Sequence, residues 1–227
     1  MTTYILELLA SFLAVMIVIT LHEFAHAYVA DKCGDPTAKL SGRLTLNPTK
    51  HFDPLGILMF ALAGFGWAKP VPVNPYNFKN YTKGCVLTSI AGVVVNYLSA
   101  FLFYPLYLLV AIYVLPLVAG KYLAILLQYF FIYLWSYSLS FCVFNLLPFY
   151  PLDGFRVIDA VNKKRGKVFT FLRDKGSFIL LGLIFLSFVA DRIPALAVLD
   201  ILGYVMSFAT NVLGRPITLL WRWIFKI

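Results

Sequence analysis

Hydrophobic residues in this 227-residue chain fall into long runs that short polar connectors separate. Three long runs lie at residues 4–30, 85–117 and 122–147, and two shorter ones follow at residues 176–190 and 194–213. A helix needs about 20 mostly apolar residues to cross the hydrocarbon core of a bilayer. The pattern therefore predicts an all-α polytopic membrane protein with about five transmembrane helices.

Four shorter stretches have patterns of their own. At residues 38–47 apolar and polar positions alternate, which predicts a strand or a small membrane-associated β hairpin or sheet. The apolar residues 55–64 are too few to span a bilayer and predict a re-entrant or interfacial segment. Three prolines exclude a helix at residues 69–75, which are expected to be extended. Residues 215–227 mix tryptophan with basic residues, as an interfacial helix does.

Composition supports a membrane protein and excludes other classes. The chain is 61% hydrophobic and only 13% charged, which excludes an ordinary soluble domain. The net charge of +9 does not indicate nucleic-acid binding, because the basic residues lie in connectors, where they act as topology signals. The cysteines, Cys33, Cys85 and Cys142, are scattered and indicate neither a disulfide framework nor a cysteine metal site. No cleaved signal peptide is expected, because no basic segment precedes the first run.

The distribution of Lys and Arg predicts the orientation. Seven lie at residues 32–83, seven at residues 156–175 and three in the tail, and all of these are assigned to one side. The opposite side has two, Lys121 and Arg192. Because cytoplasmic loops are enriched in Lys and Arg, the N-terminus is expected outside and the first helix runs inward.

The first run contains four acidic or histidine side chains: Glu7, His22, Glu23 and His26. His22 and His26 lie one helical turn apart on one face, so two imidazoles can bind one Zn²⁺. Glu23, beside them, can take a proton from water that the metal activates. The alternative is a pair of buried histidines bonded to backbone carbonyls. Ionisable groups inside a membrane span are costly, so the catalytic interpretation is favoured.

A catalytic zinc ion takes three protein ligands and a water, and the composition limits the third ligand. Glu7 and Glu23 are the only glutamates, and Glu7 lies about 24 Å away along a helix. The position of the third histidine of metzincins is occupied by Lys32. An aspartate, His51 or a cysteine therefore remains.

Asp153 is the preferred third ligand. It follows two prolines that break the end of the third run, on the same predicted side of the membrane as His26. The alternative for Asp153 is the N-cap of a following helix. Asp53 is interpreted as an N-cap, because Pro54 follows it at a first helical position.

Two distant motifs together resemble the site-2 protease family of intramembrane zinc metalloproteases, peptidase family M50. They are His22-Glu23-Phe24-Ala25-His26 and Asn145-x-x-Pro148-x-x-x-Leu152-Asp153-Gly154. Segments at residues 44–54 and 67–74 are similar to the short branch of that family, which has no PDZ or CBS domain. The resemblance covers about residues 20–154.

The resemblance implies that His22, His26 and Asp153 bind one catalytic zinc ion and that Glu23 is the catalytic base. It also implies a single domain over residues 1–227, with a catalytic core at about 4–160, accessory helices at about 176–213 and the tail at 215–227. Residues 91–96 are similar to a Gly-Pro-x-x-Asn segment of the family, but Val93 stands where proline is usual. Helix packing by small residues is the alternative for Asn96.

The expected activity is hydrolysis of peptide bonds within or near transmembrane segments of membrane-protein substrates. Asn145 and His51 are candidates for holding the oxyanion or the substrate, with helix packing and a local hydrogen bond as their alternatives. An unwound substrate could add to an extended backbone edge at residues 40–47 or 69–75. By resemblance, we expect a multi-pass protein of a prokaryotic cell membrane, with its active site near the cytoplasmic side.

Two other function classes and one other kind of protease are alternatives. A metal transporter would need polar residues along a path, yet the second, fourth and fifth runs have almost none before their ends. An inactive membrane scaffold would more often have lost one of the four key residues. A zincin that cleaves farnesylated proteins needs a glutamate ligand, which the composition excludes.

Overall fold

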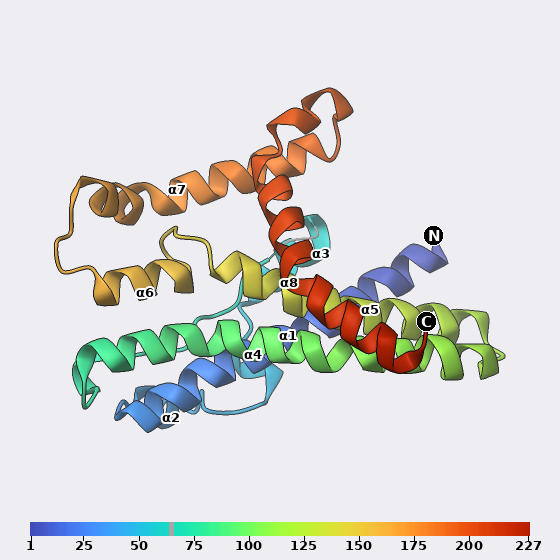
Figure 1. Ribbon diagram of the computed structural model, residues 1–227, viewed down its shortest axis with the longest axis horizontal. Coiled ribbons are helices and arrows are strands. Elements are labelled where there is room, and N and C mark those ends of the chain that lie inside the picture. The colour runs from blue at the N-terminus through green and yellow to red at the C-terminus, as the bar shows by residue number, and fades with distance from the viewer. Residues whose placement is uncertain (64–65) are drawn as a thin grey trace.

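Three long helices form the central bundle of the molecule. The computed structural model describes residues 1–63 and 66–227, and the bundle consists of α1 (Thr2–Cys33), α4 (Tyr81–Leu109) and α5 (Lys121–Asn145) (Figure 1). A π-helical turn, η3 (Val110–Val114), and a 3-10 turn, η4 (Leu115–Leu117), extend α4. All three helices are long and apolar enough to cross a membrane. They correspond to the three long runs, and a helical membrane protein is the fold that results.

Small residues let α1 approach its neighbours closely. Ala10, Ala14 and Val18 are fully buried along α1, at the three- and four-residue spacing that defines one helix face. Ala14 and Val18 pack with Leu134 of α5 in one apolar cluster. Lipid does not supply a hydrophobic drive for helix association, so such close packing is what holds membrane helices together.

Only part of the predicted span count is confirmed. Within residues 1–63 and 66–227, three helices and not five are long and apolar enough to span. The fourth run lies in α7 (Lys167–Ala190), which begins in a basic stretch. The fifth run is divided between a 3-10 helix, η5 (Pro194–Leu199), and α8 (Ile201–Phe225). The apolar runs correctly predicted helices here, whereas the relation of these helices to the bilayer depends on packing.

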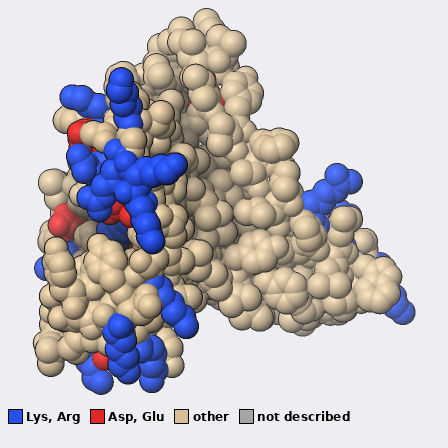
Figure 2. All heavy atoms as spheres, turned by 60° about the vertical axis from the view of Figure 1, so that its left-hand side comes forward, with Lys and Arg blue, Asp and Glu red and all other residues tan. Residues whose placement is uncertain are grey.

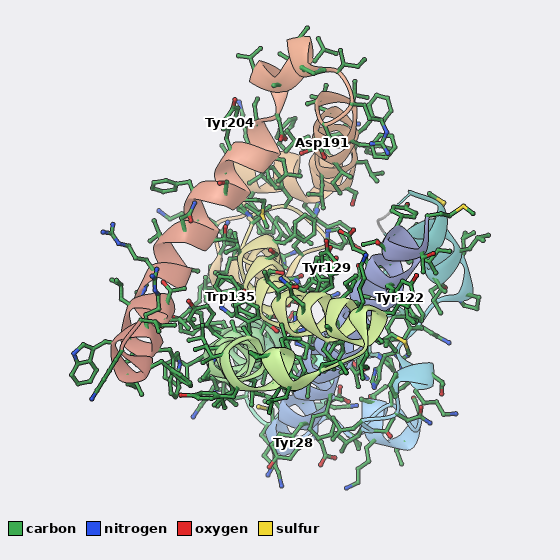
Figure 3. The ribbon with its side chains drawn as sticks, turned by 90° about the vertical axis from the view of Figure 1, so that its right-hand side faces the viewer. Tyr28, Tyr122, Tyr129, Trp135, Asp191 and Tyr204 are labelled. Atoms are coloured by element: carbon green, nitrogen blue, oxygen red, sulfur yellow. The ribbon has the colours of Figure 1, made fainter. Side chains whose placement is uncertain are left out.

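The tail is not a separate interfacial helix, because α8 continues through it to Phe225. Its end packs against the half of α4 that is remote from the metal motif, where Pro105 removes the N–H that would bond the Phe101 carbonyl. Trp221 Nε1 donates to that carbonyl at 3.0 Å instead. Figure 3 shows α8 along the side of the bundle, near Trp135 of α5.

Most basic residues gather at one end of the molecule, but those of the tail do not. Figure 2 shows Lys and Arg over the end formed by α2 (Thr37–Leu40), the start of α4 and the connection from α6 (Asp153–Val161) to α7. The three basic residues of the tail were predicted on this side. They lie instead on α8, which runs toward the opposite end, where both termini are found (Figure 1). The sequence could not show that α8 turns back along α4.

The predicted strand or hairpin at residues 38–47 is wrong. The segment contains the end of α2 and a turn with Gly42 in the left-handed region at φ 65°. Leu40 is 82% exposed and Arg43 only 7%, the reverse of the expected alternation. Arg43 is drawn inward because its Nη2 donates to the Lys69 carbonyl at 2.6 Å. A polar contact that forms only in the folded chain thus outweighs the local pattern.

The apolar run at 55–64 forms a short helix, α3 (Pro54–Ala63), and residue 64 lies outside the described residues. Asp53 caps it as predicted, because its Oδ1 accepts from Leu55 N and Gly56 N at 3.0 Å each. Two 3-10 turns, η1 (Pro48–Lys50) and η2 (Pro75–Asn77), lie on either side of this region. Between them, residues 70–74 run without helix, as the prolines require.

Candidate metal centre

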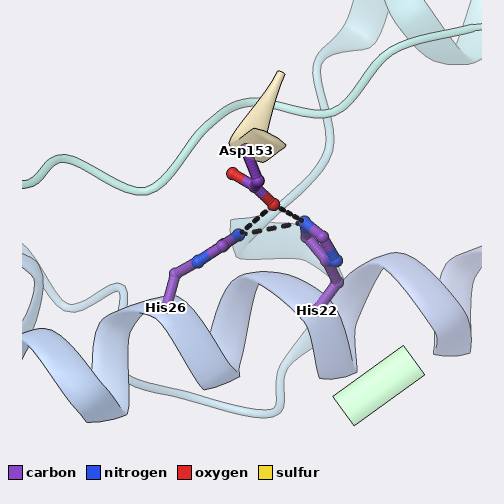
Figure 4. A group of neighbouring side chains, drawn as sticks. All are labelled: His22, His26 and Asp153. Carbon is purple, nitrogen blue, oxygen red and sulfur yellow. Dashed lines mark hydrogen bonds and ion pairs between the residues drawn. The ribbon is translucent and has the colours of Figure 1, made fainter. Parts of the chain in front are cut away.

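Three buried side chains converge on one point at the centre of the molecule. His22 and His26 extend from one face of α1, and Asp153 extends toward them from the first turn of α6 (Figure 4). The two Nε2 atoms are 3.0 Å apart, and Asp153 Oδ2 lies 3.2 Å from His22 Nε2 and 3.1 Å from His26 Nε2. Ligands about 2.0–2.1 Å from a tetrahedral zinc ion are separated by about 3.3 Å. The three atoms therefore fit one zinc ion closely.

The chain after α5 is shaped to bring Asp153 to this point. After Asn145 it turns through residues 146–152 and starts α6, which packs on α4. A side chain at Gly154 would overlap the carbonyl oxygen of Leu146, so glycine is needed for this close approach. Asp153 makes no capping hydrogen bond, and its buried Oδ2 has no hydrogen-bond partner. The N-cap alternative is therefore not observed, and an unpaired anionic oxygen faces the two histidines.

One face of α4 supports both histidines from behind. His26 Nδ1 lies 2.7 Å from the Thr88 carbonyl oxygen, and His22 Nδ1 lies 3.0 Å from Asn96 Nδ2. The sequence alternative of a histidine bonded to a backbone carbonyl is thus realised at His26, but through Nδ1. Its Nε2 stays directed toward His22 and Asp153, so the carbonyl contact and metal binding are compatible.

Gly92 lies between these two supports and has no room for a side chain. A Cβ there would lie 2.5 Å from His22 Cε1 and 2.6 Å from His26 Nε2. We expect Gly92→Ala to displace both imidazoles and to lower zinc affinity. Changes in residues that support metal ligands typically lower metal affinity about 10–100-fold, and the loss here should be at least as large. Metal titration of the purified protein measures this.

The matched control is Gly182→Ala, because Gly182 is also in a helix but has open space where its Cβ would be. That change should leave zinc affinity unaltered and slightly favour α7. Zinc binding by Gly92→Ala that equals the wild type would show that the histidines need no clearance from α4.

Glu23 lies next to the cluster and is held by the extended segment. Its side chain is buried, and Oε2 accepts a hydrogen bond from the backbone N–H of Val71 at 2.8 Å. Pro70 and Pro72 on either side have no N–H, so Val71 is the single donor among these three residues. A backbone group carries no sequence signal, which is why this partner was not predicted.

Hydrogen bonds to Arg43, to the His51 carbonyl and to Asp35 hold residues 68–74 in place. Lys69 is bonded on both sides, because its N–H donates to the His51 carbonyl at 2.9 Å and its carbonyl accepts from Arg43. Ala68 forms an antiparallel bridge with Phe52. Asp35 Oδ2 accepts from Asn74 N at 2.7 Å. Together these contacts fix the segment that positions Glu23.

Asp35 is a fully buried anchor that the sequence analysis did not identify. Burial alone would raise the pKa of its carboxyl, but hydrogen bonds from Thr37, Asn77 and Asn74 outweigh this and lower it. The carboxylate therefore stays charged and keeps the segment attached to the end of α1.

The two remaining candidate residues occupy different surroundings. Asn145 lines the cavity beside the cluster, and its Nδ2 donates to the Phe141 carbonyl at 3.1 Å. His51 is fully buried, and its Nε2 lies 2.8 Å from the Thr45 carbonyl oxygen. His51 is not among the described residues that line the cavity.

A largely apolar cavity of about 540 Å³ contains the cluster and Glu23. It is lined from Phe12 to His26 along α1, about 21 Å of helix. Further lining residues come from α3, α5, the extended segment, α7 and α8, including Phe60, Phe141, Val71, Ile184 and Met206. The cavity thus reaches from the metal centre into the part of the molecule predicted to lie in lipid.

The chain is similar to proteins that are named as putative zinc metalloproteases. The chain is 49% identical over 140 residues to "Putative zinc metalloprotease YwhC" of Bacillus subtilis. The matched region covers 62% of this chain and 63% of that relative. The chain is also 31% identical over 151 residues to "Putative zinc metalloprotease Rip2" of Mycobacterium tuberculosis. This matched region covers 63% of this chain and 54% of that relative. The matches therefore span less than two thirds of these relatives. No family model matches the chain, and no solved structure matches it significantly.

Proposed function

We propose that this chain is an intramembrane zinc metalloprotease of the site-2 type, which hydrolyses peptide bonds within or near transmembrane segments. The observation that carries the proposal is the convergence of Asp153 of α6 on His22 and His26, which lie beside Glu23 on a helix apolar enough to span a membrane. Similarity to proteins named as zinc metalloproteases supports it. The cluster atoms match the donor types and spacing of a catalytic zinc site.

In this proposal His22, His26 and Asp153 hold the zinc ion, which supplies Lewis-acid activation of water and of the scissile carbonyl. Glu23 accepts the proton of the attacking water and passes it to the leaving amine. The Val71 N–H holds Oε2 and so fixes the rotamer of this base. The buried surroundings exclude bulk water and strengthen each of these electrostatic contacts.

Asn145 is the candidate donor to the oxyanion. It lines the cavity with the cluster, and one of its two amide hydrogens is used by the Phe141 carbonyl. The second hydrogen is available to a developing negative charge. His51 is placed to brace the extended segment through its backbone carbonyl, which accepts from Lys69 N.

The proposed substrate is a transmembrane segment that unwinds at the site. An intact helix uses its own carbonyls in hydrogen bonds, and an unwound one must pair its backbone elsewhere within the membrane. Residues 70–74 border the cavity without helix or strand and can offer backbone groups for such pairing. The corresponding role proposed for residues 40–47 is less favoured, because none of these residues is among the described residues that line the cavity.

The apolar lining argues against a transport path for metal ions. Away from the cluster, Phe12, Val15 and Ile19 of α1 line the cavity, and hydrated cations find few partners there. The basic end of the bundle, where α4 and α7 begin, is proposed to face the cytoplasm, because cytoplasmic connections are enriched in Lys and Arg. The metal centre then lies nearer the cytoplasmic side of a multi-pass cell-membrane protein.

Metal removal tests the proposal. The purified protein in detergent should contain about one zinc ion per chain and cut a single-span test substrate within its span. Treatment with a zinc chelator should abolish cleavage, and added zinc should restore it, because the metal activates the attacking water. Zinc content is measured by atomic emission and the cleavage site by mass spectrometry.

A matched substrate whose span is a continuous poly-leucine helix serves as the control, because it resists unwinding. Zinc binding without cleavage of any span in a varied panel would contradict the protease assignment and favour a transporter or scaffold.

A further inference from the structure

We propose that Asn96 is a positioning residue that holds His22 in the tautomer whose Nε2 can bind metal. The inference rests on the proposed zinc site and gives a role to a residue whose role the sequence analysis left open. Asn96 is fully buried on α4, and its amide lies 3.0 Å from His22 Nδ1. It touches the imidazole on the side opposite the metal-facing nitrogen.

The observed pairing leaves one polar atom of the Asn96 side chain without a hydrogen-bond partner. With Asn96 Nδ2 directed at His22 Nδ1, the other amide atom, Oδ1, is buried without a hydrogen-bond partner. A buried unpaired amide oxygen is unfavourable by about 1–3 kcal/mol in general. Packing alone does not explain why an asparagine occupies this position, because a leucine of similar volume would avoid that cost.

The chemistry of the neutral imidazole resolves this. A histidine that binds metal through Nε2 carries its hydrogen on Nδ1, and that N–H needs an acceptor. An amide nitrogen cannot accept, whereas the amide oxygen can. The two amide atoms are assigned from their surroundings, and rotating the group by 180° presents Oδ1 to His22 Nδ1–H. In the metal-binding state Asn96 Oδ1 therefore accepts from His22 Nδ1–H, and the amide nitrogen gives up its contact with that ring nitrogen.

The second histidine shows the same arrangement independently. His26 Nδ1 lies 2.7 Å from the carbonyl oxygen of Thr88, which can only accept, so Nδ1 is the protonated nitrogen. Thr88, Gly92 and Asn96 are spaced by four residues and share one face of α4. This face sets both imidazoles in one tautomer, in which each Nε2 carries a lone pair and the two Nε2 atoms are 3.0 Å apart. Two lone pairs at that distance repel each other unless a cation lies between them.

Substitutions at Asn96 separate an acceptor role from a packing role. Asn96→Ala removes the acceptor, and Asn96→Asp keeps an acceptor of the same shape that cannot donate. We expect Asn96→Ala to lower zinc affinity about 10–100-fold, and Asn96→Asp to stay within about threefold of the wild type. Ser99→Ala, a buried change one turn along α4, is the control and should bind zinc as the wild type does.

Zinc affinity is measured by competition with a chromophoric chelator on detergent-purified protein that elutes as a single folded species. Asn96→Leu, which fills the volume without an acceptor, replaces Asn96→Ala if that variant does not fold. The inference is overturned if the acceptor-free variant binds zinc as tightly as the wild type does. It is also overturned if Asn96→Asp binds zinc as weakly as the acceptor-free variant. Failure of the wild type itself to bind zinc would instead overturn the proposed function.

Discussion

Replacing Glu23 with glutamine is expected to leave zinc binding intact and to lower substrate cleavage by about 10²–10⁴-fold, the usual contribution of a general base. Glutamine has nearly the shape of glutamate, and its amide oxygen can still accept from Val71 N–H, as Glu23 Oε2 does at 2.8 Å. It cannot take a proton at neutral pH. Initial rates of cleavage of the single-span substrate, with zinc content measured on the same samples, test this.

The control makes the same chemical change elsewhere on α1. Glu7 accepts a hydrogen bond from the Tyr133 hydroxyl at 2.6 Å, and Glu7→Gln can keep that bond. Its cleavage rate should match the wild type. If Glu23→Gln loses zinc together with activity, Glu23 supports the metal and is not only a base. If it cleaves at the wild-type rate, the proton acceptor is a different group.

Asp153→Ala is expected to abolish both zinc binding and cleavage. The change removes the one carboxylate of the cluster and leaves His22 and His26 as a two-ligand site, one fewer than a catalytic zinc ion needs. The loss of affinity should exceed the about 10–100-fold typical of supporting residues such as Asn96. Metal content after gel filtration, and cleavage in the presence of added zinc, measure it.

Asp159→Ala is the matched control, because Asp159 is on the same short helix but pairs with Arg165 at 3.5 Å near the surface. Surface pairs contribute little, so its zinc content and activity should be unchanged. One zinc ion per chain in Asp153→Ala would contradict the ligand assignment and direct attention to His51 or another aspartate.

The sequence by itself determined the parts that depend on local pattern and composition. Long apolar runs predicted the helices that became α1, α4 and α5, because helix formation in lipid follows from hydrophobic length. The spacing of His22 and His26 placed them on one helix face before any fold was known. The scarcity of glutamate left an aspartate, His51 or a cysteine as the third ligand, and the position of Asp153 after two prolines made it the preferred one. The structure brings Asp153 to 3.1–3.2 Å from both histidines.

Only the tertiary structure decided what depends on contacts between distant segments. Residues 38–47 form no hairpin, and Arg43 there bonds the Lys69 carbonyl. Helix α8 turns back along α4, where its residues join an apolar cluster and Trp221 bonds the Phe101 carbonyl. Backbone atoms also hold two side chains of the candidate site, because Val71 N–H bonds Glu23 and the Thr88 carbonyl bonds His26. Every residue has backbone atoms, so the residue type does not predict which of them bonds a buried side chain. Their role is set when folding brings a side chain that lacks a partner within reach.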